Sequence, residues 1–80
     1  MFIEKLELNQ IEAALAAGRR VYEWKTKDPH KLPIVGPAYD DHPGLNRAKR
    51  EERYADTLPA AKAAAARQGT EIVAALFLTE

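Results

Sequence analysis

The longest apolar run of the chain lies near its C-terminus, from Ile72 to Leu78. A strand with one face in water alternates apolar and polar residues, and this run does not alternate. It therefore needs cover on both faces. We predict a central strand over residues 71–79. One face would carry Ile72, Ala74, Leu76 and Leu78, and the other Val73, Ala75 and Phe77.

Two further segments favour strands. Residues 2–8 place Phe2, Leu6 and Leu8 on one face of an extended chain. Residues 20–26 are rich in aromatic and β-branched side chains, which favour strands. The alternative for the second segment is a helix continued through Gly18, at a cost of about 1 kcal/mol for the internal glycine.

Three segments have helical patterns. The first, residues 10–17, follows Asn9 as the N-cap, with Glu12 where a capping box places it and Gly18 at the end. The second is residues 45–56, capped by Asp41 or His42 with Pro43 in its first turn. The third is the alanine-rich segment 58–68, which Thr57 caps and Gly69 ends.

A long proline-rich connection, residues 27–44, separates the second strand from the second helix. Its four prolines exclude a helix, because each removes a donor and restricts the residue before it. Loops of this length are usually functional or disordered. Apolar residues such as Leu32 and Ile34 argue against disorder, and residues 33–36 could form a short edge strand.

These elements predict one α+β domain over residues 1–80. The order is strand, helix, strand, loop, two helices and strand, with a small three-stranded sheet and the C-terminal strand in its centre. The alternative is an all-α bundle in which residues 70–80 form a last helix capped by Thr70.

The composition narrows the class of protein. Twelve basic and twelve acidic residues cancel, so global charge gives no attraction to nucleic acid or anionic lipid. Without cysteine there is no disulfide and no thiolate metal site. The start of the chain lacks the pattern of a signal peptide, and the C-terminal run is too short to cross a bilayer. We expect a cytoplasmic protein that does not enter membranes.

Candidate catalytic chemistry is sparse. The chain has no serine or cysteine nucleophile and no glycine-rich phosphate loop, so whether it is an enzyme stays open, with the balance towards a non-enzyme. We expect no cofactor. One loop gathers carboxylates and imidazoles suited to a divalent metal or to acid–base chemistry, although turn and cap roles are the favoured explanation for them. These residues are His30, Asp40, Asp41 and His42.

The first functional hypothesis is a non-enzymatic protein-binding module, such as an inhibitor, adaptor or accessory factor. The apolar proline loop and the nearby aromatic residues could form an interface or add a strand to a partner's sheet. The candidate residues are Tyr22, Trp24, Leu32, Ile34, Val35 and Tyr39. A core position for Trp24 is the competing interpretation.

The second hypothesis is nucleic-acid binding through the basic side chains of the segment 45–56. The candidates are Arg47, Lys49, Arg50 and Arg53. Acidic neighbours favour local pairs instead, such as Arg47 with Glu51 four residues later. A homodimer is a further expectation, because a second copy would cover the second face of the C-terminal strand if the first copy cannot.

Overall fold

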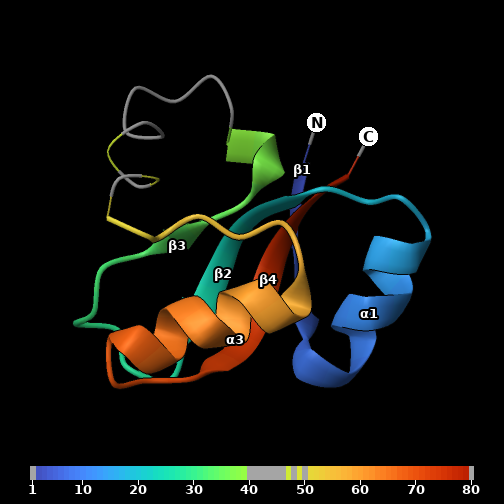
Figure 1. Ribbon diagram of the computed structural model, residues 1–80. Coiled ribbons are helices and arrows are strands. Elements are labelled where there is room, and N and C mark those ends of the chain that lie inside the picture. The colour runs from blue at the N-terminus through green and yellow to red at the C-terminus, as the bar shows by residue number, and fades with distance from the viewer. Residues whose placement is uncertain (1, 40–46, 48, 50, 80) are drawn as a thin grey trace.

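The computed structural model describes residues 2–39, 47, 49 and 51–79. Four strands form one antiparallel sheet in the order β1-β4-β2-β3 (Figure 1). The strands are β1 (Phe2–Glu7), β2 (Val21–Thr26), β3 (Ile34–Val35) and β4 (Ile72–Thr79). The helices are α1 (Leu8–Ala16), the short 3₁₀ helix η1 (Pro37–Tyr39) and α3 (Leu58–Arg67).

The predicted α+β class is confirmed, and the alternative all-α bundle is wrong. The C-terminal segment is the central strand β4, because β1 pairs along one of its edges and β2 along the other. The sheet has four strands rather than the predicted three. The fourth is the two-residue β3, which falls within the short edge strand expected at residues 33–36.

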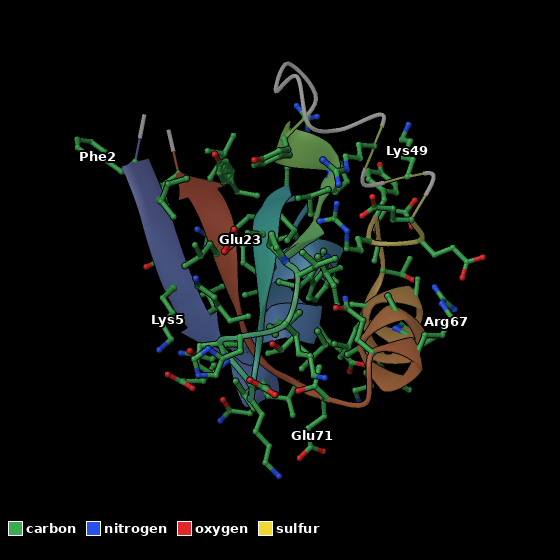
Figure 2. All side chains as sticks on the ribbon, turned by 90° about the vertical axis from the view of Figure 1, so that its left-hand side faces the viewer. Phe2, Lys5, Glu23, Lys49, Arg67 and Glu71 are labelled. Carbon is green, nitrogen blue, oxygen red and sulfur yellow. The ribbon has the colours of Figure 1, made fainter. Side chains whose placement is uncertain are left out.

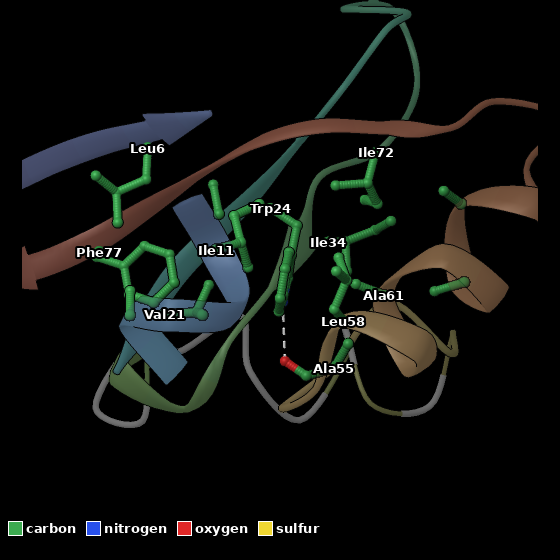
Figure 3. Packing of buried hydrophobic residues seen from close by; sticks show 14 residues of the cluster. Leu6, Ile11, Val21, Trp24, Ile34, Ala55, Leu58, Ala61, Ile72 and Phe77 are labelled. Atoms are coloured by element: carbon green, nitrogen blue, oxygen red, sulfur yellow. Dashed lines mark hydrogen bonds between the residues drawn. The ribbon is translucent and has the colours of Figure 1, made fainter. Parts of the chain in front are cut away.

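Both long helices pack on one face of the sheet (Figures 1 and 3). The core between them is apolar, and its largest fully buried side chains are Trp24, Phe77, Ile11, Ile34 and Val21. The alanines of α3 let this helix approach closely, since Ala61, Ala64 and Ala65 are each at most 1% exposed.

A bulge in β2 explains the ambiguous pattern of residues 20–26. Val21 pairs with Phe77 and Glu23 with Leu76, so Tyr22 is an extra residue opposite β4. Because of this extra residue, the side chains of Val21 and Trp24 both point into the core, although the two residues are three positions apart. This spacing is typical of a helix, but the strand prediction is confirmed.

A second bulge lies in β4 and corrects the predicted faces of this strand. Lys25 pairs with Ala74 and Thr26 with Ile72, which leaves Val73 as the extra residue. Ile72 therefore joins Ala75 and Phe77 in the core instead of sharing a face with Ala74. The prediction that Ile72 lies with Ala74, Leu76 and Leu78 is wrong, because strict alternation fails at a bulge.

The start of α1 also differs from the prediction. The helix begins at Leu8 directly after β1, so Asn9 is inside it and is not the N-cap. Glu7 is the N-cap, and its backbone N–H donates to Oε1 of Gln10 at 3.0 Å. The chain therefore changes from strand to helix between Glu7 and Leu8. The order of polar and apolar residues does not predict this abrupt change. Gly18, with a φ of 84°, follows the helix as predicted.

The predicted helix over residues 45–56 is only partly within the described residues. Arg47 and Lys49 are helical, but residues 51–56 are not, and Glu52 has a φ of 57°. The helix cannot continue because the backbone of residues 53–55 pairs with Val35 instead. The part of the prediction that includes Asp41, His42 and Pro43 lies outside the described residues.

The alanine-rich helix matches its prediction closely. Oγ1 of Thr57 accepts a hydrogen bond from the backbone N–H of Ala60 at 3.2 Å, and Gly69 has a φ of 76° after the last turn. Among the described residues, no helix has the length and apolar character needed to cross a membrane.

Candidate functional site

A surface hollow of about 290 Å³ lies between the proline loop and the segment that follows residue 46. Its lining combines apolar side chains with two arginines and one carboxylate. The lining residues are Leu32, Pro33, Val35, Tyr39, Arg47, Glu51 and Arg53. The hollow therefore brings together residues from both functional hypotheses.

Backbone pairing fixes the floor of the hollow. The N–H of Val35 donates to the carbonyl of Arg53 at 2.7 Å, and the carbonyl of Val35 accepts from the N–H of Ala55 at 3.0 Å. Residues 53–55 thus run beside β3 and occupy its outer edge. Because this edge is already paired, Val35 cannot add a strand to a partner's sheet, and only side-chain contacts are available there.

Trp24 anchors the same segment from the core. Its indole Nε1–H donates to the carbonyl of Ala55 at 2.9 Å, and the side chain is 1% exposed (Figure 3). An indole N–H needs a partner when buried, and here the partner belongs to the segment that forms the wall of the hollow. Trp24 is therefore a core residue that holds the hollow in place.

Three charged side chains form one wall. Oε1 of Glu51 accepts from Nε of Arg47 at 2.9 Å, while Oε2 lies 2.9 Å from Nε and 2.8 Å from Nη2 of Arg53. These hydrogen bonds lower the pKa of the Glu51 carboxyl below its usual value. The hydrogen bond to Glu51 likewise raises the pKa of Arg47. The carboxylate is thus held ionised between two guanidinium groups.

Arg53 is the more constrained of the two arginines. Its side chain is 11% exposed, and Nη1 donates to the carbonyl of Pro33 at 2.9 Å. The arginine therefore links the segment after residue 50 to the proline loop. Arg47 contrasts with it, because its side chain is 73% exposed and stands at the outer rim.

Tyr39, which lines the hollow, packs against Tyr22. The ring centroids of Tyr22 and Tyr39 are 4.9 Å apart and the rings are tilted by 42°. Burial is the largest cause that raises the pKa of the Tyr39 hydroxyl. The nearby Tyr22 and Glu23 raise this pKa further. The guanidinium of Arg20 donates to the carbonyl of Pro37 at 2.7 Å, which fastens η1 to the start of β2.

The predicted protein-binding residues divide into two groups. Leu32, Val35 and Tyr39 line the hollow together, with Leu32 the most exposed of them at 55%. Tyr22 lies behind Tyr39. Trp24 and Ile34 are buried in the core, so they do not lie on the surface.

The described members of the predicted basic face each have a local partner. Arg47 and Arg53 flank Glu51, and the expected pair between Arg47 and Glu51 is present. Nζ of Lys49 lies over the ring of Tyr54, 4.8 Å from its centroid. Arg50 lies outside the described residues.

The proposed metal residues are mostly outside the described part of the chain. Asp40, Asp41 and His42 are not described. His30 is exposed, and its backbone N–H donates to Oδ1 of Asp28 at 3.0 Å, a turn contact. Within residues 2–39, 47, 49 and 51–79, no cluster of three or more histidine, aspartate or glutamate side chains could hold a metal ion.

Sequence reasoning missed the role of Pro33 and the position of Arg53. The contact between them joins residues 20 positions apart, and no local pattern reports it. The only signal in the sequence was the apolar character of the loop, which predicted that the loop is pinned to the body. No protein family, curated protein or solved structure matches the chain significantly.

Proposed function

We propose that the protein is a non-enzymatic binding module that receives an apolar side chain of a protein partner in the hollow. The observation that supports this proposal is the position of Leu32, 55% exposed beside the buried Val35 and the half-buried Tyr39. A large apolar side chain at the mouth of an apolar hollow gains most from being covered by a partner.

The rigidity of the hollow supports the same proposal. Its walls are joined by the contact of Trp24 with Ala55 and of Arg53 with Pro33. Nε2 of Gln68, at the end of α3, also donates to the carbonyl of Leu32 at 3.3 Å. A surface that is ordered before binding loses little conformational entropy when a partner docks.

The size of the hollow favours a peptide segment over a small molecule. A volume of about 290 Å³ lies at the lower limit of small-molecule pockets, which are roughly 300–1,000 Å³. It suits one or two side chains of a larger partner, whose remaining surface would rest on the rim.

The charge of the rim defines the partner further. The described lining includes two guanidinium groups and one carboxylate, so its charges sum to one positive charge. Arg47 is the exposed member. We therefore expect the partner to carry an Asp or Glu close to the apolar side chain, because a guanidinium pairs well with a carboxylate.

The test is selection from a displayed peptide library, followed by affinity measurement on three variants. Leu32→Asp should abolish binding of the selected peptides, and Arg47→Glu should weaken peptides that contain an acidic residue. Leu8→Asp is the matched control, since Leu8 is also exposed, at 40%, but lies at the start of α1. Equal binding by Leu32→Asp and wild type would refute the proposal.

Nucleic-acid binding by Arg47, Lys49, Arg50 and Arg53 stays an alternative proposal. Arg47 and Lys49 are exposed, whereas Arg53 is engaged with Glu51 and Pro33. The alternative predicts a complex in a gel shift at about 50 mM salt that weakens steeply as salt rises. We also propose a cytoplasmic location, in keeping with the lack of cysteine.

A further inference from the structure

The sheet has a second face, opposite α1, which we call the open face (Figure 2). Residues that pair across strands point to the same side of a sheet. Leu6, Ala75 and Trp24 pair in one row and face the core. The next row, Lys5, Leu76 and Glu23, therefore lies on the open face.

The middle of the open face is apolar. Leu76 and Leu78 of β4 lie along it and are half-buried, and the neighbouring Ile3 of β1 is 46% exposed. Both α1 and α3 pack against the other face, and no helix of the described chain crosses this one in Figure 2. An apolar strip on a sheet face that no described helix covers is typical of an interface.

Charged side chains flank this strip in an ordered pattern. Beside Leu76, Lys5 stands on β1 and Glu23 on β2. In the next row, beside Ala74, the signs are reversed, with Glu7 on β1 and Lys25 on β2. Each row thus has opposite charges on its two sides, and the four charges sum to zero.

One two-fold rotation makes this pattern complementary to itself and also brings the leucines of the two copies together. A two-fold axis parallel to β4 and above Leu76 exchanges the β1 side of one copy with the β2 side of the other. Lys5 then faces Glu23 of the second copy, Glu7 faces Lys25 of the second copy, and the leucines meet in the middle. A two-fold axis across the strands at Leu76 would set Lys5 against Lys5, which is unfavourable. An axis across the strands between the two rows would set Lys5 against Glu7, but Leu76 would then lie over Ala74 of the second copy instead of over Leu76.

We propose that two copies of the chain pack through their open faces, related by the axis along β4. Packed sheets lie about 10 Å apart, which leaves room for the leucines to interdigitate. Three strands of about six residues span roughly 15 by 20 Å, a small area for a permanent dimer. The dimer is therefore reversible, with a Kd on the order of micromolar.

The experiment is sedimentation equilibrium of wild type and charge variants over about 1 µM to 1 mM protein. Wild type should shift from 8.9 kDa towards twice that mass. Because each substitution occurs in both copies of the dimer, Lys5→Glu and Glu23→Lys should each raise the Kd of the dimer by about tenfold or more. The double variant Lys5→Glu/Glu23→Lys should restore it, because opposite charges face each other again.

Lys62→Glu is the matched control, because it makes the same charge change at an exposed position of α3 and should leave the dimer unchanged. Circular dichroism verifies that each variant is folded. Rescue by the double variant, with loss in either folded single variant, supports the proposal. A wild-type monomer at 1 mM, or single variants that associate like wild type, would overturn it. The result is independent of peptide binding in the hollow, which Leu32→Asp tests separately.

Discussion

The substitution Trp24→Phe tests the link between the core and the wall of the hollow. The indole N–H donates to the carbonyl of Ala55 at 2.9 Å in a site where Trp24 and Ala55 are each 1% exposed. Phenylalanine keeps an aromatic ring but removes this donor, so the buried carbonyl of Ala55 loses its indole partner.

The expected loss of stability in Trp24→Phe has two contributions. A buried carbonyl that loses its partner costs about 1–3 kcal/mol. The smaller ring also removes roughly 40 Å² of buried apolar surface, or about 1 kcal/mol. Together they lower the free energy of unfolding by about 2–4 kcal/mol. For a domain of this length each kcal/mol shifts the Tm by about 4–8 °C, so the Tm should fall by at least about 8 °C.

Thermal unfolding followed by circular dichroism measures this shift. Phe2→Ala serves as the control, because the ring of Phe2 is 74% exposed and its loss should move the Tm by less than about 4 °C. A Trp24→Phe protein that melts within about 4 °C of wild type would refute the reasoning. In that case the hydrogen bond to Ala55 would not stabilise the segment that lines the hollow.

Three further substitutions test other parts of the structure. Gly36→Ala should lower stability by about 2 kcal/mol or more in a denaturant titration, because the added Cβ would overlap the backbone carbonyl oxygen and the side chain of Val21. Thr57→Ala should cost about 1 kcal/mol through the lost helix cap, and Thr57→Ser should restore most of it. Arg53→Gln should raise the pKa of Glu51 in an NMR titration. Since the folded pKa of Glu51 is depressed, its stabilising contribution is present above its unfolded pKa and disappears as the pH falls through the folded pKa.

The sequence predicted those parts of the fold that depend on local patterns. The apolar run of β4, the threonine cap of α3 and the glycines after both helices each carry a direct physical signal. The two bulges carry none, because an extra residue depends on how the neighbouring strands are registered. The same reason explains why Val21 and Trp24 both face the core although they are three positions apart.

The candidate site was predicted in part. The apolar residues of the proline loop indicated an ordered surface, and Leu32 and Tyr39 line the hollow. The contact between Arg53 and Pro33 and the pairing of residues 53–55 with Val35 join distant parts of the chain. The sequence pattern predicted a helix as far as residue 56, but the backbone of residues 53–55 pairs with Val35 instead.

The most direct test of the binding function is an NMR titration of labelled protein with the tightest peptide from the library selection. Amide shift changes should concentrate at residues 32–39 and 51–55, around the hollow, and Leu32→Asp should eliminate them. Shift changes centred on the open face around Leu76, or unchanged binding by Leu32→Asp, would show that the peptide does not bind in the hollow.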